Sequence, residues 1–157
     1  MNVEIFEKIS TALGEGKGFK IKQALSNLNP TEASNLVIRF NEQEICFILS
    51  SLDSNVSAEI ILELPEDVRT KTLKELDNKS ILSVLEGLES DDATDLISDL
   101  DDEKSKEILE NMNPRDSSEV QALLQYKQDP AGGIMQTELV EVKNSSIIKD
   151  AINWIRL

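Results

Sequence analysis

The sequence contains no histidine and a single cysteine, Cys46, among its 157 residues. A Ser-His-Asp triad, a Cys-His pair and a zinc site of cysteines and histidines therefore cannot be assembled from this chain. Aromatic residues make up only 4% of it, too few for the aromatic platforms of a sugar-binding cleft, so a glycosidase pair of carboxylates is also disfavoured. We do not expect an enzyme.

Long apolar runs and nucleotide-binding loops are missing as well. No segment approaches the ~18 uninterrupted apolar residues of a membrane span, and the first residues, MNVEIFEKIS, lack the basic and then apolar form of a signal peptide. There is no GxxxxGK[ST] loop, and Gly14, Gly16 and Gly18 follow no predicted strand. The chain is expected to be cytosolic in character, and its glycine cluster to form a loop.

Acidic residues dominate what is present. Thirty Asp and Glu against sixteen Lys and Arg give a formal net charge of −14, which repels nucleic acid and favours cations or basic partners. The acid is concentrated, since residues 86–103 carry nine acidic side chains and no basic one. With 39% hydrophobic and 29% charged residues, the composition is that of a soluble globular protein with one principal domain.

A twelve-residue repeat runs through most of the chain. When the sequence is divided every twelve residues from Leu25, eight blocks result, and their first and fourth positions are apolar throughout. The blocks begin LSNL, VIRF, LSSL, ILEL, LKEL, LEGL, ISDL and LENM. The twelfth position is also apolar in most blocks, and Thr72 is the exception. Polar steps such as Asn29-Pro30-Thr31-Glu32 have the composition of helix starts. Because the spacing across each block join is i, i+1, i+4, it indicates helices rather than strands.

The repeat predicts an all-α fold: a right-handed-type α-solenoid of short helices, with 12 residues per helix unit. Each helix of roughly eight to ten residues is too short to persist alone and must be stabilised by its neighbours. Residues at the repeat positions are expected to form one continuous core. They are Leu25, Leu28, Leu49, Leu52, Leu73, Leu76, Leu85, Leu88, Leu109 and Met112.

Beyond Tyr126 the repeat ends. Residues 129–133, DPAGG, indicate a hinge, residues 137–143, TELVEVK, predict a strand, and residues 147–157, IIKDAINWIRL, predict an amphipathic helix. One strand and one helix cannot bury a core. We therefore expect a helical domain at 1–128, followed at 129–157 by a hinge and the truncated start of an α/β domain.

Asp91 and Asp95 stand out within the acidic run. On a helix that begins near Ser90 they lie one turn apart on the same face. This face has two interpretations: a solvated surface that keeps the protein soluble, or a hard-cation site, because Mg²⁺ often takes only one or two carboxylates from a protein and keeps several waters. The chain has no EF-hand loop, which argues against a dedicated calcium cage.

Stacked short helices that end in YKQDPAGGIM (126–135) and lead into TELVEVK resemble the cytosolic N-terminal domain of the MgtE family of magnesium transporters and channels, with the start of its CBS-domain pair. The resemblance implies a cytoplasmic domain of an inner-membrane protein that works as a homodimer. Its implied partners are the CBS domain and the membrane pore of the same full-length chain. Mg²⁺ is the implied cofactor: it binds between acidic faces of the N and CBS domains and thereby closes the pore.

The resemblance also implies site residues. Asp91 and Asp95 match the carboxylates of the family's Asp-Asp-x-x-Asp segment, and Glu59 matches a further ligand. Mg²⁺ binding to this chain alone is expected to be weak, because the other half of the site is absent. The alternative comes from another class: an armadillo-like interaction module, similar to helical domains of flagellar motor switch proteins, whose acidic run binds a basic partner without metal.

Overall fold

The computed structural model describes residues 2–125, and this part of the chain consists of ten α-helices without a strand. In chain order the helices are α1 (Asn2–Gly14), α2 (Gly18–Leu25), α3 (Pro30–Val37), α4 (Glu42–Ser50), α5 (Ser54–Leu62), α6 (Glu66–Glu75), α7 (Asn78–Leu85), α8 (Ser90–Ser98), α9 (Asp102–Asn111) and α10 (Pro114–Leu123). The expected all-α fold of short stacked helices is confirmed. The hinge, strand and helix expected beyond residue 128, and the domain boundary before them, lie outside the described residues.

Helices begin where the sequence predicts them. Asn29 and Asn41 each form a reciprocal capping box, in which the side-chain oxygen accepts the backbone N–H of Glu32 or Glu44 and that glutamate accepts the backbone N–H of the asparagine. Asp77 caps α7 by accepting the backbone N–H of Ser80 at 2.7 Å. Such caps satisfy amide groups that have no partner inside the helix.

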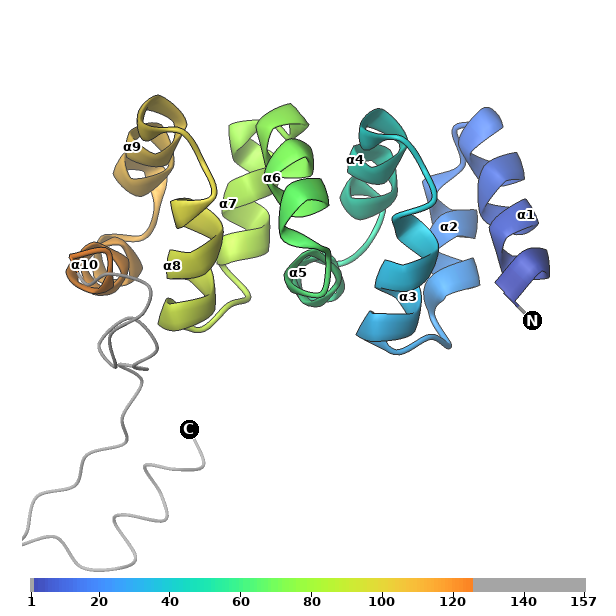
Figure 1. Cartoon of the computed structure of the whole chain (residues 1–157), viewed down its shortest axis with the longest axis horizontal. Coiled ribbons are helices and arrows are strands. Elements are labelled where there is room, and N and C mark those ends of the chain that lie inside the picture. Colours follow the sequence, from blue (N-terminus) through green and yellow to red (C-terminus); the bar gives the residue numbers. More distant parts are fainter. Residues whose placement is uncertain (1, 126–157) are drawn as a thin grey trace, which may run out of the picture.

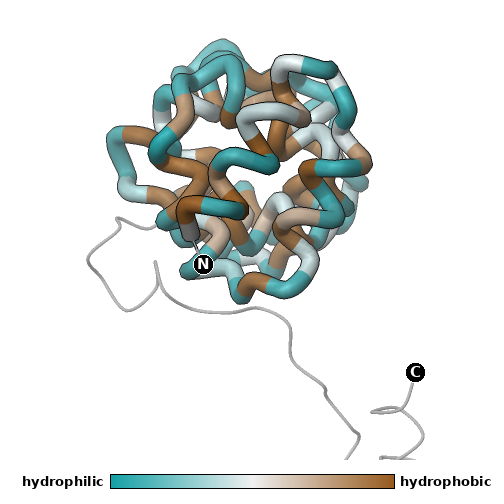
Figure 2. Tube along the Cα trace, turned by 90° about the vertical axis from the view of Figure 1, so that its right-hand side faces the viewer, coloured by the Kyte–Doolittle hydropathy of each residue, from teal (hydrophilic) through white to brown (hydrophobic). Residues whose placement is uncertain are grey.

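The helices stack along one axis, from α1 at one end to α10 at the other (Figure 1). From α3 onward, the helices pack mainly against the helix two places along the chain: α3 with α5, α4 with α6, α5 with α7, α7 with α9, and α8 with α10. At the N-terminal end, α1 packs mainly against α2, which also contacts α4. Viewed along the stack, hydrophobic and hydrophilic residues alternate along the coils, as expected of amphipathic helices (Figure 2). No helix within residues 2–125 has both the length and the apolar character needed to cross a membrane.

One continuous hydrophobic core runs through the stack. All ten core residues expected from the repeat belong to it, five of them buried and five half-buried at its edge. The buried residues are Leu25, Leu49, Leu73, Leu76 and Leu85, and the half-buried ones are Leu28, Leu52, Leu88, Leu109 and Met112. The predicted core is confirmed.

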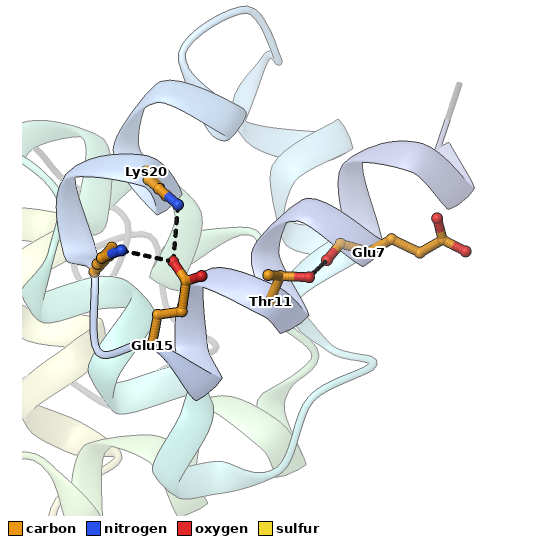
Figure 3. A network of polar contacts seen from close by, with 5 residues as sticks. Glu7, Thr11, Glu15 and Lys20 are labelled. Carbon is orange, nitrogen blue, oxygen red and sulfur yellow. Dashed lines mark hydrogen bonds and ion pairs between the residues drawn. The ribbon is translucent and has the colours of Figure 1, made fainter.

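The expected glycine loop joins α1 to α2. Gly16 has a φ of 64°, a left-handed conformation that glycine adopts without strain. Glu15 closes the turn by binding Lys17 Nζ at 3.1 Å and Lys20 Nζ at 2.8 Å (Figure 3). Gly18 starts α2 beneath Ser51, whose Oγ would lie only 2.6 Å from a Cβ at this position. The glycines therefore allow a tight turn and a close approach to the end of α4.

Polar contacts also connect helices that are distant in sequence. Lys104 Nζ of α9 donates to the backbone oxygens of Leu73, Lys74 and Leu76 at 2.9, 2.9 and 2.6 Å. A cation at the C-terminal end of α6 satisfies carbonyls that lack intrahelical partners and interacts favourably with the helix dipole. This contact holds α9 against the end of α6.

Candidate functional site

The candidate site is a line of aspartates on α8, which we call the acidic stripe: Asp91, Asp92, Asp95 and Asp99. The helix begins at Ser90, as the sequence predicts, and turns Ala93, Leu96 and Ile97 into the core. Burying those side chains leaves Asp91, Asp92 and Asp95 on the other side of the helix, with Asp99 at its C-terminal cap. Asp91, Asp95 and Asp99 follow one another at intervals of four residues and so share one face.

Negative charge is concentrated at the N-terminal end of the stripe. Partial burial raises the pKa of Asp92, and the negative charges of Asp91, Asp95 and Glu89 raise it further. Burial also raises the pKa of Asp95, against the opposing effect of Arg69. Asp91 Oδ1 is buried and has no hydrogen-bond partner. Buried polar atoms are nearly always satisfied, so this oxygen is a candidate acceptor for a ligand.

The C-terminal end of the stripe, in contrast, is paired. Arg69 Nε of α6 donates to Asp99 Oδ2 at 2.6 Å, and the two side chains are only 19% and 10% exposed. Sequence reasoning missed Arg69, because it lies thirty residues before its partner. The signal that could have found it is a recurrent spacing, since Lys22 and Asp53 pair across 31 residues in the same way.

Glu59 lies elsewhere on the stack. It is an exposed residue of α5, beside a partly apolar hollow that Leu25 and Val56 also line. Within residues 2–125, no three Asp, Glu, Cys or His side chains are grouped closely enough to hold a metal ion. The structure thus brings Asp91 and Asp95 onto one face but does not join Glu59 to them.

The oxygen atoms of the stripe could provide some of the ligands of a hard cation. Carboxylate oxygens are the ligands that Mg²⁺ prefers, and the unpartnered Asp91 Oδ1 is an oxygen of this kind. The remaining ligands would have to be water or groups from another domain. On its own, the stripe could therefore supply only part of the coordination shell of such an ion.

Comparison with known proteins assigns most of this chain to a family. The family model described as the MgtE intracellular N domain matches residues 28–129, which begins after α1 and α2. A search of curated proteins finds no match.

Two solved structures share the fold. The crystal structure of the cytosolic domain of the Mg²⁺ channel MgtE in complex with ATP is 25% identical, with a TM-score of 0.84, over 96% of this chain and 62% of that one. The soluble part of a magnesium transporter is 20% identical, with a TM-score of 0.80, over 99% of this chain and 62% of that one. This chain thus spans less than two thirds of either relative. On the match across residues 28–129, it belongs to the MgtE intracellular N domain family.

Proposed function

We propose that this chain is the cytosolic regulatory part of a magnesium transporter or channel in the cell membrane, and that its acidic stripe senses Mg²⁺ against a CBS domain. The observation that carries the proposal is the unpartnered carboxylate oxygen of Asp91 on the acidic face of α8, in a chain of the MgtE N-domain family. The similarity to a cytosolic domain of a Mg²⁺ channel supports the same assignment.

Asp91 and Asp95 would supply carboxylate oxygens to the ion. In this proposal a hydrated Mg²⁺ sits between α8 and an acidic surface of the CBS domain. Two facing acidic surfaces repel, and divalent cations between them convert that repulsion into attraction. Because only the closed arrangement offers ligands from both sides, Mg²⁺ shifts the population towards closure, and the pore closes when the ion is plentiful.

Glu59 is proposed as a second contact for Mg²⁺, on α5 and separate from the stripe. The proposed organisation is a helical domain at 1–128, a hinge and the start of a CBS domain at 129–157, and a full-length homodimer. The family assignment favours this function over the interaction module, which requires a basic partner and no metal.

Limited proteolysis of the full-length protein tests the proposal. Millimolar Mg²⁺ should protect the surface between the N and CBS domains from cleavage. Asp91→Asn with Asp95→Asn should abolish much of that protection without unfolding the helices, because the change removes like charges and no core contact. A matched control is Asp102→Asn with Glu103→Gln, which neutralises two exposed acids of α9 outside the stripe and should leave the protection intact.

Equal Mg²⁺ protection in the Asp91/Asp95 variant and the parent would remove these aspartates from the mechanism. No Mg²⁺ effect in either protein would favour a merely solvated acidic face. A footprint that appears only with a basic protein, with or without metal, would favour the interaction module.

A further inference from the structure

The ion pair of Arg69 and Asp99 differs from the other ion pairs in residues 2–125. Its side chains are 19% and 10% exposed, whereas those of Lys22 and Asp53 are 51% and 67% exposed. Exposed pairs of the latter kind are worth little, but a largely buried charge needs its partner. Arg69 is therefore fixed against the end of α8.

Arg69 acts on more than Asp99. Asp95 lies one helical turn before Asp99 on the same face of α8, so the guanidinium group bound to Asp99 also lies on the side of Asp95. The acidic stripe is thus divided: a protein cation neutralises its Asp99 end, while its Asp91 end keeps an unpartnered, buried carboxylate oxygen.

We propose that Arg69 is a built-in counter-ion, which occupies the Asp99 end of the stripe, confines a divalent cation to the Asp91 end, and limits how tightly that cation binds. This inference rests on the proposed function, because it concerns regulation of the same site. Arg69 would act on the ion through Asp95 and Asp99 and is a positioning residue.

The physical reason is competition between cations. A divalent ion beside Asp91 and Asp95 is repelled by the guanidinium group, and this repulsion is poorly screened because the pair is largely buried. Removal of Arg69 would leave Asp99 as a nearly buried carboxylate without a partner, and an external cation could then replace the missing charge. The stability of such a variant should depend on divalent cations, and that of the parent should not.

Thermal unfolding of the 157-residue chain and calorimetric titration with MgCl2 test this inference. In NaCl, Arg69→Gln should lower the melting temperature by several degrees, and MgCl2 at equal ionic strength should restore much of the loss. The variant should also bind Mg²⁺ several-fold more tightly than the parent. Arg69→Lys, which keeps the charge, should show the small Mg²⁺ response of the parent.

Two further variants isolate the charge effect. Arg39→Gln removes a positive charge that lies over the ring of Phe6 and should leave the Mg²⁺ response unchanged. Adding Asp99→Asn to Arg69→Gln removes both members of the ion pair and should abolish the Mg²⁺ rescue. Equal Mg²⁺ responses in Arg69→Gln, Arg39→Gln and the parent would overturn the inference.

If Arg69→Gln does not fold, Asp99→Asn provides the test in the full-length protein. It frees the Arg69 charge beside Asp95, so the Mg²⁺ concentration needed for proteolytic protection should rise; an unshifted concentration would overturn the inference. These outcomes are separable from those of the proposed function. Proteolytic protection that depends on Asp91 and Asp95 but not on Arg69 would refute only the counter-ion role of Arg69. Tighter Mg²⁺ binding by Arg69→Gln without any proteolytic protection would refute only the proposed gating function.

Discussion

Thr72 is a polar residue at a position that the repeat otherwise fills with apolar side chains. It is fully buried, and its Oγ1 has no hydrogen-bond partner. Its neighbours in the repeat, Ile60 and Val84, are buried at equivalent positions. The position therefore belongs to the core, and its hydroxyl is desolvated without compensation.

Thr72→Val should therefore stabilise the protein. Valine has nearly the same shape and removes a buried hydroxyl, whose desolvation costs about 1–3 kcal/mol when it is left unsatisfied. Urea unfolding at neutral pH measures the change. The matched control is Thr94→Val, because buried Thr94 Oγ1 donates to the backbone oxygen of Ser90 at 2.6 Å, and loss of this bond should destabilise. A loss of stability in Thr72→Val would mean that the hydroxyl is satisfied.

Asp92 makes an unfavourable, pH-dependent contribution to the free energy of unfolding. It lies in the first turn of α8, where the helix dipole favours an acid, yet burial and its acidic neighbours raise its pKa. A raised pKa means that the folded state binds the proton more tightly than the unfolded state. The ionised group therefore lowers the free energy of unfolding at neutral pH, and this penalty fades as the pH falls through the raised pKa.

Asp92→Asn should accordingly raise the free energy of unfolding at pH 7, by about 0.2–0.5 kcal/mol, the size of a like-charge pair on a helix surface. The gain should shrink on acidification and vanish below the ordinary aspartate pKa of ~3.9. Asp77→Asn should behave oppositely, because the backbone N–H of Ser80 lowers the pKa of Asp77. Its ionised form stabilises the fold at neutral pH, and that stabilisation is lost as the pH falls through the lowered pKa.

Urea unfolding of the Asp92→Asn and Asp77→Asn variants at several pH values measures both changes in the free energy of unfolding. A pH-independent gain for Asp92→Asn would show that the raised pKa of Asp92 is not its cause.

For the individual helices, the twelve-residue repeat predicts where each helix lies in the sequence but not how deeply each repeat position is buried. Its first position is buried in every block but the last, where Leu109 is half-buried. Its fourth position is buried only at Leu64, Leu76 and Leu100 among the eight blocks. The reason is the place of each position in the helix: the first falls in the last turn, whereas the fourth lies just beyond the helix end and covers the edge of the core. Hydropathy alone treats the two positions as equal.

Truncation of leucines at the two positions should differ for that reason. Leu73→Ala, at a first position and 1% exposed, should cost about 2–5 kcal/mol, because it leaves a cavity in the core. Leu88→Ala, at a half-buried fourth position, should cost clearly less, since solvent can fill part of the vacated space. Circular dichroism during urea unfolding measures both losses. Equal losses would contradict the distinction between core and edge.

In the molecule as a whole, the candidate site is predictable from the sequence only in part. The acidic run and the four-residue spacing place Asp91 and Asp95 on one face of a helix, and local periodicity suffices for this. Arg69 was not predictable in the same way, because its pairing with Asp99 depends on how α6 and α8 approach each other in the stack. Periodicity within one helix carries no information about that approach.

The net charge of −14 makes a prediction about the entire fold. Self-repulsion of a strongly charged chain destabilises its compact state. NaCl shortens the Debye length from about 30 Å at 0.01 M to about 3 Å at 1 M, so the free energy of unfolding at pH 7 should rise with salt. Surface ion pairs such as Lys22 with Asp53 are weakened at the same time, but exposed pairs contribute too little to reverse the trend.

Urea unfolding at low and high NaCl measures this effect, and pH provides its control. Near the sequence pI of about 4.4 the net charge approaches zero, so the stabilisation by NaCl should largely disappear. MgCl2 at matched ionic strength should add little to the stability of the parent chain. No three acidic side chains within residues 2–125 are grouped closely enough to hold a metal ion, and Arg69 already neutralises one end of the stripe. Stability that is independent of NaCl at pH 7 would show that repulsion among the acidic side chains is too weak to destabilise the fold of this chain.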